Sequence, residues 1–275
     1  MTKPKLSREI RKHYESVREE ARLGAHSGQL EFYRTKEIIS RYLPKTRSMI
    51  FDIGGGPGPY ALWLAKLGHA VHLVDPVARH VQQAAAGSQS QYRTALASIT
   101  LGDARKLHFD DESADVVLLL GPLYHLVKRR DRLKALAEAH RMLKPGGLLF
   151  AAGISRFASA FDGLFRNFIK DPRFFRIVQR DLKDGQHRNP TNHPRYFTTA
   201  FFHHPSELQS EMHAAGFESL QLYALEGPGW LLGNFEEYWK KPKLRARLLT
   251  IIRLMETEST LIGQSAHILA MARKS

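Results

Sequence analysis

The sequence predicts an α/β protein built on a mainly parallel sheet, and three observations lead to this class. The 275 residues are enough for a large domain with a full hydrophobic core. The composition, with 43% apolar and 25% charged residues, is typical of a globular protein rather than a disordered chain. Short apolar runs alternate with helical patterns over residues 48–154, as in buried strands that are linked by helices.

Residues 7–43 are expected to form two helical pieces with a break near Gly24 and Gly28, because apolar side chains recur there at helical spacing. Five strands then follow as short apolar runs, at residues 48–53, 70–75, 97–101, 115–120 and 148–154. Helices are expected between them, at residues 60–67, 77–86 and 129–143. This alternation predicts βαβ units and therefore a parallel sheet.

The alternation stops after residue 154 and resumes at residue 205. Residues 155–200 carry helical aromatic stretches and a polar loop, and no strand is expected there. Beyond them the sequence predicts a helix at 205–215, a strand at 217–225, a helix at 235–258 and a last strand at 266–272. We expect one domain, 1–275, divided into segments 1–47, 48–154, 155–204 and 205–275. The insertion at 155–204 is placed where loops usually carry specificity.

The turn after the first strand is rich in glycine and reads Asp52-Ile53-Gly54-Gly55-Gly56-Pro57-Gly58. Glycines let a backbone approach a ligand closely, and the following helix offers free N–H groups at its N-terminus. The dinucleotide spacing G-x-G-x-x-G fails, because Pro59 stands where the third glycine belongs. The spacing that fits is D-x-G-x-G-x-G, which predicts a binding turn; a purely structural glycine turn is the alternative.

Together with residues at the ends of the other strands, this turn resembles the corresponding turn of the class I S-adenosylmethionine (SAM)-dependent methyltransferases. Asp75 ends the second strand and Asp103 the third. Further matches are Gly121-Pro122-Leu123-Tyr124-His125 after the fourth strand and Lys144-Pro145-Gly146-Gly147 before the fifth. The match is strong over residues 48–154 and resumes over 205–273. It implies a Rossmann-like seven-stranded sheet with an antiparallel last strand, SAM at the carboxyl ends of the strands, and residues 1–47 as a helical lid.

The resemblance also implies how the cofactor is held. A carboxylate at Asp75 can accept both ribose hydroxyls, and Asp103 would face the adenine amino group. The alternatives are an ordinary strand-end aspartate at Asp75 and a simple turn at Gly102-Asp103. Arg34 would meet the carboxylate of the cofactor in a bidentate pair. The cofactor-binding residues that it implies are Asp52, Gly54, Gly55, Gly56, Gly58, Asp75, Pro76, Asp103, Ala104, Gly121, Tyr14 and Arg34.

Methyl transfer from a sulfonium needs little covalent help, but an O–H or protonated amine acceptor must lose a proton. His125 is the best candidate for this base, since its ordinary pKa is near neutrality and it follows the fourth strand. Tyr124 would line the pocket or orient the acceptor. A histidine that caps the next helix and a tyrosine that merely packs are the alternatives. The chain has no cysteine, so proton removal falls to histidine, tyrosine or carboxylate.

The insertion is rich in aromatic side chains, which suit a flat or apolar small acceptor, although a packed aromatic core is the alternative. These side chains are Phe157, Phe161, Phe165, Phe168, Phe174, Phe175, Tyr196, Phe197, Phe201 and Phe202. Four histidines, His187, His193, His203 and His204, match no metal-binding spacing, and no metal is expected. Residues 226–230 form a loop that covers the pocket or a simple turn.

The chain carries 41 lysines and arginines against 27 acidic residues, a net charge of +14, which favours an anionic partner such as nucleic acid. The charge is spread along the chain, no RNA-binding module is apparent, and nucleic acid is not expected. No secretory signal or membrane span is recognised, so we expect a cytoplasmic protein. The leading hypothesis is a SAM-dependent methyltransferase acting on an O or N atom of a small molecule such as a secondary metabolite. An RNA methyltransferase and a SAM-binding protein without turnover are the alternatives, and the oligomeric state is open.

Overall fold

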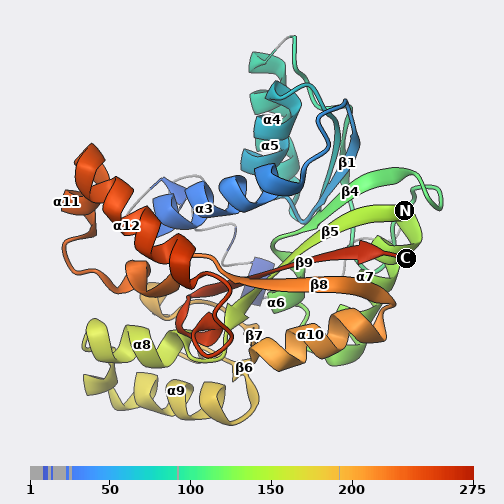
Figure 1. Ribbon diagram of the computed structural model, residues 1–275. Coiled ribbons are helices and arrows are strands. Elements are labelled where there is room, and N and C mark those ends of the chain that lie inside the picture. The colour runs from blue at the N-terminus through green and yellow to red at the C-terminus, as the bar shows by residue number, and fades with distance from the viewer. Residues whose placement is uncertain (1–8, 12–13, 15–22, 25–26, 92, 192) are drawn as a thin grey trace.

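The computed structural model describes residues 9–11, 14, 23–24, 27–91, 93–191 and 193–275. A mostly parallel sheet forms the centre, and helices cover both of its faces (Figure 1). Side chains of α3, α4 and α5 pack on one face, and side chains of α7 and α10 pack on the other. The first helical piece expected before Gly24 lies almost wholly outside the described residues. Among the described helices, none is both long and apolar enough to span a membrane.

The five predicted parallel strands are present. Its strands are β1 (Met49–Ile53), β2 (Ala70–Asp75), β3 (Ser98–Leu101), β4 (Ala114–Leu119) and β5 (Leu143–Ser155), arranged as β3-β2-β1-β4-β5. The helices between them are α4 (Pro59–Lys66), α5 (Ala78–Ser90), the short α6 (Pro122–His125) and α7 (Arg129–Met142). Parallel neighbours require such crossover connections, so all five strands end at one edge of the sheet.

The antiparallel last strand is confirmed. Helix α10 (Pro205–Ala214) leads into β8 (Phe217–Ala224), and β9 (His267–Lys274) runs antiparallel to both β5 and β8. The start of β9 therefore lies at the edge of the sheet where the parallel strands end, because His267 pairs with Ile154 near the end of β5.

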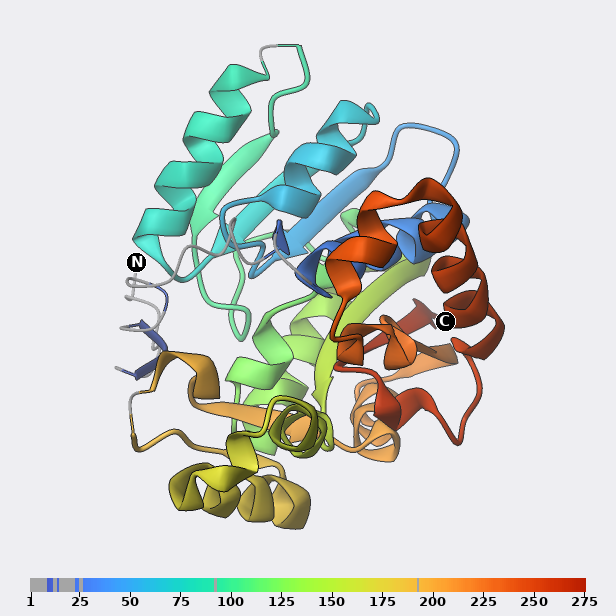
Figure 2. The ribbon, with the colours of Figure 1, turned by 90° about the vertical axis from the view of Figure 1, so that its left-hand side faces the viewer.

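The insertion contains strands that the sequence analysis did not expect, so the sheet has nine strands among the described residues rather than the expected seven. They are β6 (Gln186–His187) and β7 (Ala200–His203), which follow α8 (Ala158–Phe165), the turn η1 (Phe168–Lys170) and α9 (Pro172–Asp184); the turn η2 (Pro194–Tyr196) lies between them. β7 pairs in parallel with Ile154 and Ser155. At Ile154, β9 pairs with one side of β5 through His267. The pairing of β4 with the opposite side ends at Ala151, so β7 pairs with β5 on that side, beyond the end of β4. Figure 2 shows α8 and α9, in yellow, together below the strands.

The single helix predicted over residues 235–258 is wrong, because Pro242 divides it into α11 (Phe235–Lys240) and α12 (Pro242–Met255). Proline lacks the N–H that a continuous helix would need at this position. Helix α3 (Ser27–Tyr42) lies beside α12, where Leu30 packs with the apolar residues Leu248, Leu249 and Ile252 (Figure 1). The turns η3 (Gly227–Leu231) and η4 (Ile262–Gln264) complete this region.

Candidate active site

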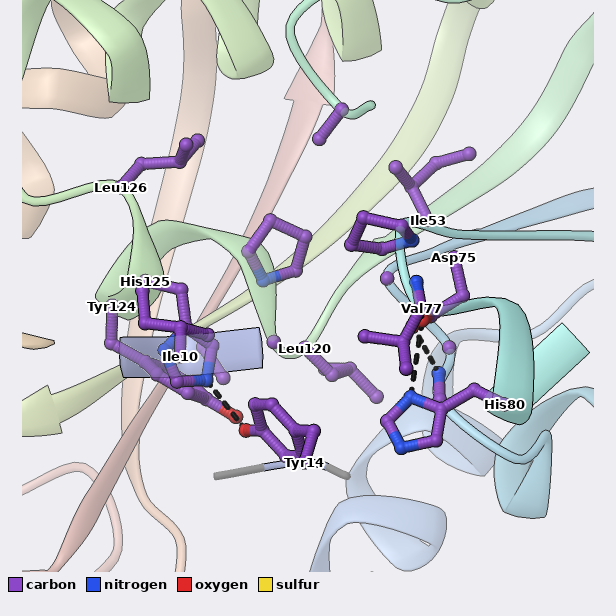
Figure 3. Close-up of a pocket in the computed structure, with 18 of the residues that line it drawn as sticks. Ile10, Tyr14, Ile53, Asp75, Val77, His80, Leu120, Tyr124, His125 and Leu126 are labelled. Carbon is purple, nitrogen blue, oxygen red and sulfur yellow. Dashed lines mark hydrogen bonds and ion pairs between the residues drawn. The ribbon is translucent and has the colours of Figure 1, made fainter. Parts of the chain in front are cut away.

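A cavity of about 700 Å³ lies at the carboxyl ends of the parallel strands (Figure 3). Its size is within the range of small-molecule and cofactor sites. Every residue that the sequence analysis assigned to the cofactor or to catalysis lines it, apart from Gly58 and Arg34. The lining also includes residues that were not foreseen, among them Glu31, Thr35, Tyr60, His80, Arg105, Asp131, Thr199 and His267.

The glycine-rich turn brings the ends of β1 and β4 together. Gly54 has φ +72° and donates its N–H to the Val74 carbonyl over 2.7 Å. A Cβ on Gly54 would stand 2.6 Å from Pro122 Cγ, so only glycine allows the two loops to approach this closely. Gly58, with φ +89°, instead faces Leu73 and lets α4 pack on β2. The assignment of Gly58 to the cofactor is therefore wrong.

Asp75 is buried and fixed by three hydrogen bonds. Its carboxylate accepts from the N–H groups of Gly56 and Val77, each over 2.9 Å, and lies 3.1 Å from His80 Nδ1. The glycine turn, the end of β2 and the first turn of α5 are thus held in one arrangement. His80 was missed by the sequence analysis, although its place in the first turn of the helix that follows Asp75 would have indicated the contact.

Asp52 is a buried carboxyl group beside the glycine turn. Burial and the neighbouring charge of Asp75 raise the pKa of Asp52 to about 7, against an opposing effect of the Ala61 backbone N–H. Neither carboxyl oxygen makes a hydrogen bond of ordinary geometry within the described residues. A buried carboxylate on a cavity wall suits a ligand that carries positive charge or hydrogen-bond donors.

Asp103 is held by an arginine that the sequence analysis did not consider. Arg105 donates from Nε to Oδ1 over 2.9 Å and from Nη2 to Oδ2 over 2.5 Å. The same guanidinium lies 3.4 Å from Asp131 at the start of α7. A ligand group that meets Asp103 would therefore share this carboxylate with Arg105.

Tyr14 and His125 meet across the cavity although they are 111 residues apart. The Tyr14 hydroxyl lies 2.6 Å from His125 Nε2, and the two rings are nearly perpendicular at 5.2 Å (Figure 3). Tyr14 also packs edge-on against His80 at 5.4 Å, and Tyr124 packs against His125 at 4.6 Å. Tyr14 therefore bridges the cofactor side, through His80, and the candidate base His125.

Arg34 does not point into the cavity, and its assignment to the cofactor carboxylate is wrong. The guanidinium is fully buried between α3 and the C-terminal region, where it contacts Glu256 and donates to Glu37 over 2.6 Å. It also donates to the Leu225 carbonyl over 3.2 Å. The face of α3 that lines the cavity carries Glu31 and Thr35 instead, one helical turn apart.

The aromatic acceptor pocket is also wrong, because none of those ten side chains lines this cavity. Phe168, Phe174 and Tyr196 form part of a small core within the insertion. Phe157 and Phe161 line a separate cavity of about 820 Å³. Within the described part of the insertion, Thr199 is the residue that reaches the 700 Å³ cavity.

Two of the four histidines considered for a metal are held in buried pairs with carboxylates. His187 Nδ1 lies 2.8 Å from Asp181, and His203 Nε2 lies 3.4 Å from Glu211. These pairs are separate from each other and stabilise the insertion. The described residues contain one group of three metal-ligand types within 4.8 Å, Glu31, Glu226 and His267, which the sequence analysis did not connect.

The site fits SAM, the cofactor implied by the sequence. The buried carboxylates of Asp52 and Asp75 suit a positively charged ligand with ribose hydroxyls, and the glycine turn leaves room for close approach. A doubly wound sheet with an antiparallel last strand and this site at its carboxyl edge define a class I SAM-dependent methyltransferase.

Comparisons with known proteins agree with this class. Residues 51–151 match the family described as "Methyltransferase domain", which supports a SAM-dependent methyltransferase. A ubiquinone/menaquinone biosynthesis C-methyltransferase from Acidiphilium cryptum is 27% identical over 207 residues, which are 72% of this chain and 79% of that protein. An uncharacterized methyltransferase from Mycobacterium tuberculosis is 33% identical over 41% of this chain and 42% of its own length.

Solved structures share the fold at low sequence identity. A SAM-dependent methyltransferase from Methanosarcina mazei superposes with a TM-score of 0.56 and 19% identity, over 86% of this chain and 96% of its own. A SAM-dependent methyltransferase from Thermotoga maritima, described as a possible histamine N-methyltransferase, superposes with a TM-score of 0.53 and 20% identity. The match covers 95% of this chain and 97% of that chain. At such identity the likeness establishes the fold alone.

Proposed function

We propose that this enzyme transfers the methyl group of SAM to an oxygen or nitrogen atom of a small organic acceptor, such as a secondary metabolite, with His125 as general base. The observation that carries the proposal is the 2.6 Å contact between Tyr14 and His125 Nε2 on the wall of the cavity that also holds the glycine turn. A histidine beside an acceptor atom can take its proton near neutral pH.

The chain's own residues would hold SAM through the carboxylates and the glycine turn. Asp75 would accept hydrogen bonds from the ribose, Asp103 would meet the adenine together with Ala104, and Asp52 would balance the positive charge. Pro76 and Gly121 line the same wall, where backbone atoms approach closely. Bound SAM supplies a methyl group that is already activated by the sulfonium.

His125 and Tyr14 would manage the proton of the acceptor. The contact with Tyr14 fixes the orientation of the imidazole, and Tyr124 restrains the ring from the other side. Deprotonation leaves a lone pair on the acceptor atom, and the proton moves onto the imidazole. The enclosing side chains of Ile10 and Tyr14 keep water from the reacting atoms.

The test is turnover by the purified full chain with SAM and a panel of phenols, amines and carboxylic acids, measured as release of S-adenosylhomocysteine (SAH). Methylation of a panel member that requires His125 supports the proposal. SAH binding without methylation of any acceptor would favour a SAM-binding protein without turnover. Tight, salt-dependent binding of RNA below micromolar concentration would favour the RNA methyltransferase alternative, to which the net charge of +14 is suited.

A carbon acceptor is the second candidate, because several relatives are named as ubiquinone/menaquinone biosynthesis C-methyltransferases. Carbon methylation beside a phenolic hydroxyl also needs the phenol to lose its proton, so the same base would serve. Mass spectrometry of the product formed from a phenol separates the two outcomes, since an O-methyl ether and a ring-methylated phenol fragment differently.

A further inference from the structure

A polar corner of the cavity lies away from the residues assigned to the cofactor. It consists of Glu31 and Thr35 on α3 and His267 at the start of β9, with Glu226 directly behind the imidazole. His267 Nδ1 lies 2.6 Å from Glu226 Oε1 and 3.8 Å from Glu31 Oε2. We call Glu31, Thr35 and His267, with Glu226 behind, the carboxylate–imidazole corner.

Glu226 is fixed tightly enough to orient the imidazole. Its Oε2 accepts hydrogen bonds from Ser265 Oγ over 2.7 Å and from the backbone N–H of His267 over 3.0 Å, and its side chain is almost fully buried. The 2.6 Å contact therefore favours a proton on Nδ1 of His267 that is donated to Glu226. In that tautomer the other ring nitrogen is a hydrogen-bond acceptor.

The corner offers hydrogen-bond acceptors in the direction of a ligand. An ionised Glu31 carboxylate can only accept. The Thr35 hydroxyl donates its proton to the backbone carbonyl of Glu31 over 2.8 Å, so its oxygen is left as an acceptor. A ligand group that contacts these atoms would donate hydrogen bonds to them, and two carboxylates close by favour positive charge on it.

The sheet order places the corner on the acceptor side. The carboxylates assigned to the cofactor stand at the carboxyl ends of their strands: Asp52 in β1, Asp75 in β2 and Asp103 just after β3. His267, in contrast, begins β9. From β1 to β9 the order is β1-β4-β5-β9, three strand spacings or about 14 Å across the sheet. His125 follows β4, the strand that comes next to β1 in this order.

We propose that the carboxylate–imidazole corner binds a protonated amine of the methyl acceptor, so that the acceptor is an organic cation. This deepens the proposed function, because it assumes that the cavity receives the acceptor. A metal ion fits the corner less well. Both oxygens of Glu226 are already engaged, and coordination by His267 Nδ1 would break its 2.6 Å contact with Glu226.

The experiment measures binding rather than turnover, so it can fail independently of the proposed function. The full chain, saturated with SAH, is titrated with benzylamine and butylamine and with their neutral counterparts benzyl alcohol and 1-butanol, by calorimetry at pH 7. The same titrations use Glu31→Gln, which keeps the shape and removes the charge. Glu218→Gln, at an exposed position of β8 outside the cavity, is the matched control. A separate titration uses MnCl2 alone.

The amines should bind at least about 10-fold more tightly than the alcohols, and Glu31→Gln should lose at least about 10-fold of that affinity. The SAH affinity of Glu31→Gln and of Glu218→Gln should stay within about 2-fold of the parent value. Four outcomes would overturn the proposal: binding of neither probe, equal affinity for amines and alcohols, Mn²⁺ binding that Glu31→Gln abolishes, or SAH affinity that falls with amine affinity. The last would place Glu31 in the cofactor site.

Discussion

The two halves of the cavity are built from contacts of very different range. On the cofactor side, Asp75 accepts a hydrogen bond from Gly56, 19 residues away in the sequence, and the three carboxylates lie between residues 52 and 103. On the acceptor side, Tyr14 meets His125 over 111 residues, and Thr199 contacts Glu9 over 190. A local constellation can be recognised from spacing, whereas a long-range one depends on how whole segments pack. The acceptor side should therefore be sensitive to substitutions far from the cavity.

The largest effect is expected at Arg132, which anchors the insertion. Arg132 donates to both oxygens of Glu211 over 2.8 and 2.6 Å, and stacks on Phe201. Burial would raise the pKa of Glu211, but the hydrogen bonds from His203 and Arg132 outweigh it and hold that pKa at about 2. Arg132→Met leaves a buried carboxylate without its main partner and should lower the free energy of unfolding by about 3–5 kcal/mol.

Urea denaturation of Arg132→Met measures this change, with Lys134→Met at an exposed position of the same helix as the control. SAH affinity of the folded variant should be unchanged if the two halves are independent. A loss of SAH affinity that matches the loss of stability would show that the insertion supports the cofactor side as well.

The next effect concerns His125. His125→Gln should lower kcat about 100-fold or more on an acceptor that must be deprotonated, while SAH affinity is retained. Tyr14→Phe keeps the ring contacts with His80 and His125 but removes the hydroxyl, so a smaller loss of kcat is expected. Steady-state kinetics across pH 5–9 give the comparison. A variant that keeps the rate and pH profile of the parent would reduce His125 to a structural residue.

Asp75 tests the cofactor side. Asp75→Ala removes the acceptor for the ribose and for the N–H groups of Gly56 and Val77, and should weaken SAH binding by about 1–3 kcal/mol. Calorimetric titration with SAH measures it, and Asp110→Ala, exposed and outside the cavity, serves as the control. An unchanged affinity would remove Asp75 from the cofactor site.

The smallest effect is a pH dependence at Asp52. Its pKa of about 7 lies above the ordinary value of 3.8, so the folded state binds this proton more tightly than the unfolded state does. The free energy of unfolding should therefore fall as pH rises from about 4 to about 7, and Asp52→Asn should abolish this slope. Without ligand, the variant should be more stable than the parent at pH 8 and about equally stable near pH 4.

Thermal unfolding at pH 4, 5, 6, 7 and 8 provides the test for Asp52. The difference between the variant and the parent should widen with pH and level off above pH 7. A difference that is constant over the whole range would mean that Asp52 is ionised throughout.

The positions of the strands around the glycine turn could be predicted because each of these strands is a continuous apolar run. The insertion strands could not, since Gln186–His187 is only two residues long and Ala200–His203 four, too short for a period to show. Arg34 shows that the direction of a side chain can also escape prediction from the sequence. Its position on α3 was visible in the sequence, but its direction depends on Glu256, 222 residues away.

The sequence by itself determined the fold class and, through its resemblance to a family, the cofactor. It also brought Asp52, Asp75 and Asp103 to one cavity wall, because they stand at the ends of adjacent strands in βαβ units. Tertiary structure alone decided the acceptor side: the pairing of Tyr14 with His125, the packing of the aromatic insertion as a core, and the meeting of Glu31, Glu226 and His267. The physical reason is that these contacts join segments whose relative position is set by the packing of α3, the insertion and the last strand on the sheet, and no local pattern encodes it.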